Sequence, residues 1–382
     1  MTNVNQPETT LPPPQLVETP AAFEQMVNRL LQEPSVAVDT ESNSLYAYHE
    51  RVCLIQFSIP GEDYLVDPLV LQDLRPLAPF FASEEIEKIF HGSDYDLIVL
   101  QRDYQFTCGK LFDTMWAART LGWPQVGLGN ILENYFGVHP DKKFQRYNWG
   151  RRPLNLEAVT YARTDTHYLL PLRDLQRNAL KEQGRWEEAQ EIFTYLREHV
   201  SQPSLLDPEV TFWRIKGIQE LHDQEKTTLY QLHLWREEMA QRLNRPTMKV
   251  IGNRQLLTLA HVQPRTKRDL ATAGLTKHQI EKFGDSIMHA LRTKHHPLPT
   301  PQNDNKRPPD EVMDRYQALR AWRKEVAAFR GVDSDVILPN AALWTLAWHP
   351  PATLDDLLSV PSIGPWREKT YGPDLLALTS GK

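Results

Sequence analysis

Five residues that could bind and use divalent metal ions stand in three separated segments of the chain: Asp39, Glu41, Asp96, Tyr161 and Asp165. In the first segment, Asp39 and Glu41 lie two apart behind Val36 and Val38, so in a strand both carboxylates project from one face. Two ionised carboxylates at that spacing repel each other, and a hard cation bound through oxygen relieves the repulsion. The pair favours a metal site, although a solvated strand end gives the same short sequence.

The second segment covers residues 88–104 and predicts a short strand at Lys88–His91, a Gly-Ser turn and a helix that begins near Asp94. Asp96 falls in the first turn of this helix and is the better candidate for a metal ligand, because Asp94 has an alternative role as the helix cap. His91 ends an apolar strand, so we expect a hydrogen-bonded core histidine.

The third segment, residues 155–176, predicts one helix whose apolar face contains Leu156, Val159, Ala162, Leu169 and Leu172. Tyr161 and Asp165 stand four apart and therefore share a face of the helix. A metal lowers the pKa of its bound water, and a phenol one turn from a metal-binding carboxylate can orient that water. A surface Tyr-Asp pair is the alternative, and His167 is expected to pack or to line the rim.

Taken together, D-x-E, then G-S-x-x-D-L after a strand, then Y-x-x-x-D on a helix resemble the DEDD superfamily of 3′→5′ exonucleases. The resemblance is to the tyrosine subclass, since Thr160 occupies the position where the other subclass has histidine. It implies two Mg²⁺ or Mn²⁺ ions, a catalytic role for Tyr161, and four metal-binding carboxylates: Asp39, Glu41, Asp96 and Asp165. It also implies stepwise release of nucleoside 5′-monophosphates from a 3′ end.

Residues 142–154 interleave basic and aromatic side chains, a mixture that suits single-stranded nucleic acid. The candidates for contact are Lys142, Lys143, Arg146, Trp149, Arg151 and Arg152. The stretch is similar to the segment before the last motif of the ribonuclease D family, but Tyr147-Asn148 replaces the usual Ser-Asp. A solvated basic loop is the alternative.

Charge is distributed unevenly along the chain, although the net charge is −6. Residues 1–227 contain 21 basic and 33 acidic groups, whereas residues 228–296 contain 12 basic and 5 acidic groups. We therefore predict that an acidic catalytic domain relies on a basic neighbour to attract nucleic acid. The basic candidates in that neighbour are Arg242, Arg245, Lys249 and Arg254, with Arg265, Lys267 and Arg268 further along.

An internal repeat begins where LHLWREEMAQRL from Leu232 aligns with LRAWRKEVAAFR from Leu319, at an offset of 87 residues. The alignment pairs Trp235 with Trp322 and, after a shift of one, Phe283 with Tyr371. Each copy predicts several short helices and resembles the HRDC domain of helicases and ribonuclease D. For the second copy, whose charge is nearly neutral, a purely structural role is an equal alternative.

The expected fold is an α/β ribonuclease H-like domain, with a mixed sheet flanked by helices, followed by two all-α HRDC-like helical domains. Its strand candidates are 36–41, 52–59, 63–66, 88–91 and 111–113. The predicted organisation is a disordered Pro-rich N-terminus (1–20), an exonuclease domain (21–205), a connecting helix (206–227), a first HRDC-like domain (228–294), a Pro-rich linker (295–313) and a second HRDC-like domain (314–380).

Composition fits an enzyme of two or three domains, with 382 residues and 41% hydrophobic residues. The N-terminus lacks the features of a signal peptide and no long apolar run occurs, so we expect a cytoplasmic protein without membrane contact or an obligate protein partner. We expect a 3′→5′ exoribonuclease that acts on single-stranded RNA ends, and resemblance to ribonuclease D implies tRNA precursors. A DNA exonuclease and a non-catalytic nucleic-acid-binding module remain alternatives.

Overall fold

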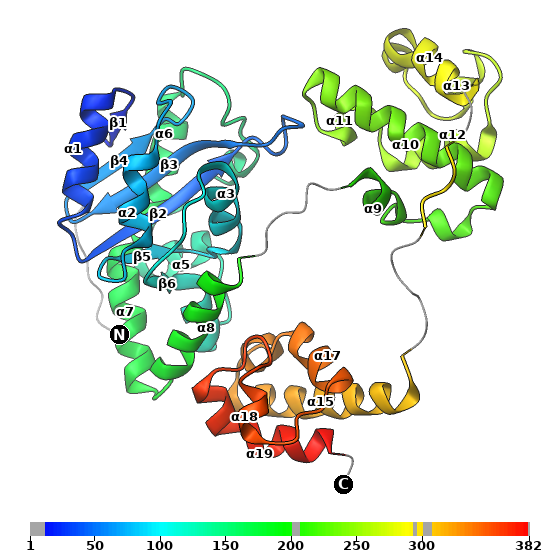
Figure 1. Ribbon diagram of the computed structural model, residues 1–382. Coiled ribbons are helices and arrows are strands. Elements are labelled where there is room, and N and C mark those ends of the chain that lie inside the picture. Colours follow the sequence, from blue (N-terminus) through cyan, green and yellow to red (C-terminus); the bar gives the residue numbers. More distant parts are fainter. Residues whose placement is uncertain (1–11, 201–206, 293–295, 301–307, 381–382) are drawn as a thin grey trace. The chain divides into compact units, whose positions relative to one another are not determined.

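The computed structural model describes residues 12–200, 207–292, 296–300 and 308–380 (Figure 1). The chain forms two compact units, of which the first combines residues 1–42, 52–202 and 307–382. The second unit combines residues 43–51 and 203–306. The second helical repeat therefore belongs to the unit that contains the predicted exonuclease region. None of the described helices is long and apolar enough to cross a membrane.

A mixed sheet of six strands forms the centre of the first unit, in the order β1-β4-β3-β2-β5-β6. Its strands are β1 (Gln15–Val17), β2 (Ser35–Ser42), β3 (Val52–Ile59), β4 (Glu62–Val66), β5 (Glu87–Phe90) and β6 (Leu111–Asp113). Strands β2, β3 and β4 pair antiparallel, and β5 and β6 run parallel to β2. This arrangement confirms the predicted fold class.

The β3–β4 turn uses Gly61 at φ +81°, a left-handed backbone that glycine adopts without strain. Strand β3 is buried along its whole length, as its sequence VCLIQFSI requires. In the β2–β3 pair, Asp39 lies opposite Gln56 and Glu41 lies opposite Leu54. The acidic pair is therefore presented from the middle of the sheet.

Helices cover the sheet and bring the other motifs to it (Figure 1). They are α1 (Pro20–Leu30), α2 (Ala78–Ala82), α3 (Asp94–Tyr104), α4 (Thr114–Thr120), α5 (Leu128–Phe136), α6 (Leu156–His167), α7 (Leu169–Glu182) and α8 (Trp186–Glu198), with 3₁₀ turns at Arg75–Leu77 and Lys142–Arg146. Helix α6 packs on β3 and β4. Asn155 caps α6 by accepting a hydrogen bond from the Ala158 amide at 2.7 Å.

Two predicted elements differ in the structure. The single helix expected over 155–176 is two helices, because α6 ends at His167 and α7 begins at Leu169, after Tyr168. Leu156, which was expected on the apolar face, is 79% exposed in the first turn of α6. Part of the segment expected to be disordered is ordered, because Gln15–Val17 adds to the sheet beside β4. The remainder of that segment, residues 1–11, lies outside the described residues.

The second unit is helical and has its own hydrophobic core. Its elements are α9 (Pro208–Trp213), a 3₁₀ turn (Ile218–Glu220), α10 (Asp223–Leu243), α11 (Thr247–Val250), α12 (Asn253–Val262), α13 (Asp269–Thr272) and α14 (Lys277–Arg292). The predicted connecting helix is therefore wrong, because Gly217 at φ +98° separates α9 from the following elements. Residues 43–51 join this unit, and the Tyr48 and His49 amides both donate to Asn244 at 3.1 Å.

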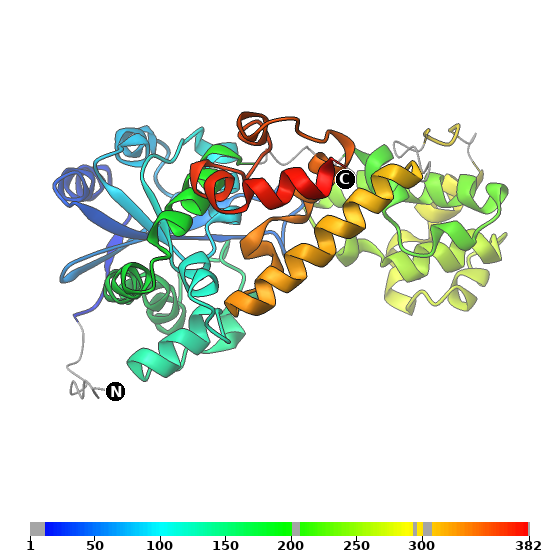
Figure 2. The same cartoon turned by 90° about the horizontal axis from the view of Figure 1, so that it is seen from below.

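The C-terminal helices pack against the exonuclease region within the first unit (Figure 2). They are α15 (Asp310–Arg330), α16 (Ser334–Ile337), α17 (Asn340–Trp348), α18 (Leu354–Leu357) and α19 (Pro365–Thr379). Helix α19 contacts α8, where Arg367 pairs with Glu191 at 2.9 Å. Arg330 at the end of α15 pairs with Glu188 of α8 at 2.5 Å. The second repeat is thus held by ion pairs as well as by apolar packing.

Candidate active site

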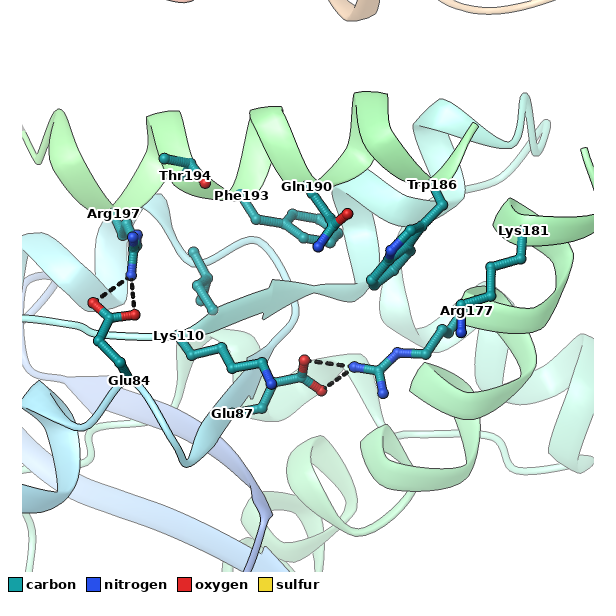
Figure 3. A pocket seen from close by; sticks show the side chains of 11 residues that line it. Glu84, Glu87, Lys110, Arg177, Lys181, Trp186, Gln190, Phe193, Thr194 and Arg197 are labelled. Atoms are coloured by element: carbon teal, nitrogen blue, oxygen red, sulfur yellow. Dashed lines mark hydrogen bonds and ion pairs between the residues drawn. The ribbon is translucent and has the colours of Figure 1, made fainter. Parts of the chain in front are cut away.

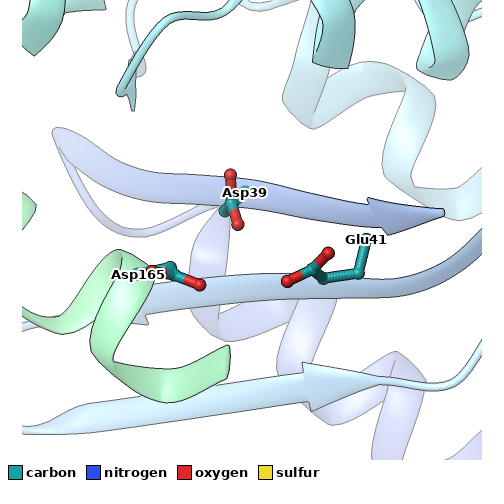
Figure 4. A group of neighbouring side chains, drawn as sticks. All are labelled: Asp39, Glu41 and Asp165. Carbon is teal, nitrogen blue, oxygen red and sulfur yellow. The ribbon is translucent and has the colours of Figure 1, made fainter. Parts of the chain in front are cut away.

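Three carboxylates meet above the middle of the sheet (Figure 4). Asp39 and Glu41 come from β2 and Asp165 comes from α6. One oxygen from each lies within 4.8 Å of the others, which is close enough for a shared metal ion. The fold therefore brings together Asp39 and Asp165, which are 126 positions apart in the sequence. Oxygen donors of this kind match the preferences of Mg²⁺ and Mn²⁺.

Asp96 is held next to this group by a neighbouring strand residue. It is 7% exposed and accepts a hydrogen bond of 2.5 Å from the Thr40 hydroxyl, and Thr40 lies between Asp39 and Glu41 in β2. Asp113 fixes the turn before α3, because the Gly92 and Ser93 amides donate to its carboxylate at 3.0 and 2.7 Å. The position of Asp96 is therefore fixed by its hydrogen bond from Thr40 and by the bonds from the turn before α3 to Asp113. The sequence analysis did not identify Asp113.

Electrostatics in this cluster favour a bound cation. Burial, followed by repulsion from the other carboxylates, raises the pKa of Asp39 and of Glu41 well above its usual range. Burial, followed by repulsion from Asp96, does the same to the pKa of Asp165, and burial raises the pKa of Asp96 to about 7. Within the described part of the chain, no lysine, arginine or histidine forms an ion pair with these four groups. A divalent metal would supply the missing positive charge.

Tyr161 lies one helical turn before Asp165 and is half-buried. Its ring packs near Phe144 and Trp149, at centroid distances of 5.3 and 6.2 Å. Burial, with further repulsion from Asp165, raises the pKa of Tyr161 far above its ordinary value. A protonated phenol can donate a hydrogen bond that orients a water or a phosphate oxygen.

Fewer side chains of the basic segment, residues 142–154, are available for contact with nucleic acid than the sequence predicted. Trp149 is only 2% exposed and belongs to a small core under α6, so its ring is not free to stack on a base. Arg152 is committed to the buried Asp67 and to the Cys53 carbonyl at 2.7 Å. Lys143 pairs with Glu157 at 2.7 Å. Lys143 nevertheless remains exposed, so its contact with nucleic acid stays a prediction. The corrections for Trp149 and Arg152 share one cause, because alternating basic and aromatic residues do not reveal which side chains point inward.

The other predicted nucleic-acid contacts are on the surface. Lys142, Arg146 and Arg151 are exposed in the first unit. In the first repeat Arg242, Arg245, Lys249 and Arg254 are exposed as well. Contact with phosphates requires exposed side chains, and these residues meet that requirement. Their contact with nucleic acid remains a prediction.

The sequence analysis also did not identify a hydrogen-bonded network around Asp63, beneath α6. Asp63 of β4 accepts from Arg163 Nε at 2.7 Å, from the Ser58 hydroxyl at 2.7 Å and from His167 Nδ1 at 2.9 Å. This network ties α6 to the sheet one turn away from Asp165. The spacing of Arg163 and His167 on one helix face was the available signal, but their partner could not be found without the strand register.

A second acidic group has a different character (Figure 3). A cavity of about 270 Å³ is lined by residues of β5, α7 and α8, among them Glu87, and by Glu84 from the segment before β5. Glu87 pairs with Arg173 at 2.6 Å and also with Arg177, while Glu84 pairs with Arg197 at 2.7 Å. Both carboxylates are therefore already neutralised, unlike those at Asp39.

Comparisons with known proteins match this division of the chain. A family model described as 3′-5′ exonuclease matches residues 14–181, and the HRDC domain model matches residues 225–291 and 312–379. The chain is 32% identical to the exosome complex exonuclease RRP6 of Saccharomyces cerevisiae over 76% of its length and 43% of the yeast protein. It is 28% identical to ribonuclease D of Desulfotalea psychrophila over 72% of its length and 74% of that protein.

A solved structure shows the same fold. The crystal structure of Escherichia coli RNase D, titled as an exoribonuclease involved in structured RNA processing, superposes with a TM-score of 0.69 at 23% identity. The match covers 96% of this chain and 99% of that one. The chain spans less than half the length of the RRP6-type relatives that it matches.

Proposed function

From a 3′-5′ exonuclease domain followed by two HRDC domains, the arrangement of ribonuclease D, we infer that this chain is a metal-dependent exoribonuclease that shortens RNA from its 3′ end. The observation that carries the proposal is the meeting of Asp39, Glu41 and Asp165 within 4.8 Å, where none of the described basic side chains forms an ion pair with them. Metal-assisted hydrolysis of a phosphodiester is the chemistry that such a cluster supports best.

Asp39, Glu41, Asp96 and Asp165 would hold the metal ions, which supply an activated water and neutralise charge on the phosphate when bound. Thr40 holds Asp96 in position, and the Asp63 network holds α6. Tyr161 donates a hydrogen bond that orients the nucleophile or the phosphate. Nucleoside 5′-monophosphates would leave one at a time.

Single-stranded RNA ends are the proposed substrate, and precursor tRNA is the natural class that resemblance to ribonuclease D suggests. The exposed Lys142, Arg146 and Arg151 would contact phosphates near the site. The basic first repeat would add affinity that does not depend on sequence. We propose that the reaction takes place in the cytoplasm and that the two HRDC-like domains have the boundaries given by the sequence.

The direct test is digestion of matched 5′-labelled single-stranded RNA and DNA with Mg²⁺ or Mn²⁺, with EDTA and Asp39→Asn as controls. We expect a ladder that shortens from the 3′ end of RNA, with a rate more than ~100-fold lower in Asp39→Asn, because loss of a direct ligand should exceed the effect of losing an outer one. Faster cleavage of DNA would favour the DNA exonuclease. Binding without cleavage would leave a non-catalytic module.

A stability measurement tests the metal site without relying on turnover. In metal-free protein the pKa of Asp96, raised to about 7 by burial, exceeds the ordinary value near ~3.9 of an unfolded chain. The native state then binds more protons, so the free energy of unfolding should rise as pH falls from about 8 to about 5. Asp96→Asn should weaken this dependence. Saturating Mn²⁺ should stabilise the protein most at the higher pH, and a metal-independent pH profile would contradict the site.

A further inference from the structure

We propose that Gln56 is a positioning residue of the carboxylate site and that its carboxamide donates a hydrogen bond to Asp39 when a metal ion is bound. This inference rests on the proposed metal-dependent function and deepens it. Gln56 lies in the middle of β3, directly opposite Asp39 in the antiparallel β2–β3 pair. Residues opposite each other in such a pair project from the same face, with Cβ atoms about 4.5–5.5 Å apart. The carboxamide is therefore next to a predicted metal ligand.

Gln56 is fully buried, and neither Nε2 nor Oε1 has a hydrogen-bond partner among the residues that the structure describes. A buried polar group without a partner costs about 1–3 kcal/mol, so a leucine or methionine of similar size would fit this position at lower cost. Two residues later on the same strand face, a buried polar side chain does have hydrogen-bond partners. The Ser58 hydroxyl is there bonded to Asp63 and to Thr166, each at 2.7 Å.

A glutamine at this position has the chemistry that a metal-binding carboxylate needs from its neighbours. Carboxylates that bind metal are themselves hydrogen-bonded, and these outer partners fix the direction of the ligand oxygens. The Gln56 amide can donate to Asp39 without adding charge, whereas a lysine would compete with the metal. No other described residue is opposite Asp39 on this side of β2, since the sheet register assigns that place to Gln56.

The test compares Gln56→Met with Gln176→Met, the same change at a fully buried glutamine of α7 that donates to the Thr114 carbonyl at 2.8 Å. Mn²⁺ affinity is measured by titration calorimetry, and the stability of the metal-free protein by urea unfolding. We expect Gln56→Met to weaken Mn²⁺ binding by about 10–100-fold without loss of metal-free stability. We expect Gln176→Met to lower stability and to leave Mn²⁺ affinity unchanged.

Unchanged Mn²⁺ affinity in Gln56→Met would overturn the inference, as would a loss of affinity that only follows a loss of stability. Should Gln56→Met not fold, Gln56→Asn retains the carboxamide but withdraws it by one methylene, and weaker Mn²⁺ binding is again expected. Failure of the proposed function is distinguishable, because wild-type protein would then bind no Mn²⁺ and Asp39→Asn would change nothing.

Discussion

In the first helical repeat (residues 225–291) Arg242, Arg245 and Lys249 are exposed, whereas the second repeat (residues 312–379) has Phe329, Val332 and Val336 at the positions 87 residues later. Val336 is fully buried and belongs to the core of the exonuclease region, and Val332 packs against the same core. The compared positions are thus basic and exposed in the first copy, whereas in the second copy Val332 and Val336 are apolar and pack against the exonuclease region.

The shared framework of the two repeats makes the contrast informative. Arg236 donates to the Ile251 carbonyl at 3.3 Å, and Arg323 donates to the Leu338 carbonyl at 2.7 Å. Each of these pairs is also related by an offset of 87 residues. An arginine therefore binds the equivalent backbone carbonyl in both copies. The two copies differ in their surface residues, which determine whether a copy faces solvent or packs against the exonuclease region.

Exchanging residues between the copies should give the largest effect. Val336→Lys places a charge in the core, so we expect the free energy of unfolding to fall by about 4 kcal/mol or more, whereas Lys249→Val should stay within about 0.5 kcal/mol of wild type. Urea unfolding followed by tryptophan fluorescence measures both. Equal effects would mean that the two faces are used in the same way.

Removing one ion pair should loosen the docked copy somewhat less. Arg330→Met leaves the fully buried Glu188 without its partner, so the free energy of unfolding should fall by about 3 kcal/mol. The double variant Glu188→Gln with Arg330→Met removes the uncompensated charge and should recover most of that loss. A double variant as unstable as the single one would contradict this account.

Charge reversal in the open copy should affect binding and not folding. With Arg242→Glu and Arg254→Glu together, we expect about tenfold weaker binding of single-stranded RNA and a salt dependence of binding shallower by about 1.4 log units per log unit. The matched control is Arg320→Glu with Lys324→Glu in the docked copy, where both side chains are exposed. If both pairs weaken binding alike, the division of roles between the copies is wrong.

The smallest effect is expected where an arginine is restored to the docked copy. Phe329 is 93% exposed, so Phe329→Arg should change the free energy of unfolding by less than about 0.5 kcal/mol. RNA affinity, measured by fluorescence anisotropy, should change by less than about twofold, because the adjoining positions are covered valines. A large gain in affinity would show that this face is open.

The sequence predicted what depends on local spacing. The placement of Asp39 and Glu41 on one strand face and the repeat offset both follow from short patterns that the structure reproduces. Docking of the second repeat could not be predicted, because a nearly neutral charge does not reveal which face is covered. The burial of Trp149 and the position of Gln56 beside Asp39 depend on strand register and on packing between distant segments.

The dependence of the exonuclease region on the second repeat also sets the order in which the protein can mature on the ribosome. Glu188 precedes its partner Arg330 by 142 residues. At translation rates of about 5–20 residues per second, the buried carboxylate waits roughly 7–28 s for its counter-charge. The nascent chain is therefore exposed to chaperones and proteases over that interval, although all its predicted metal ligands have already been synthesised.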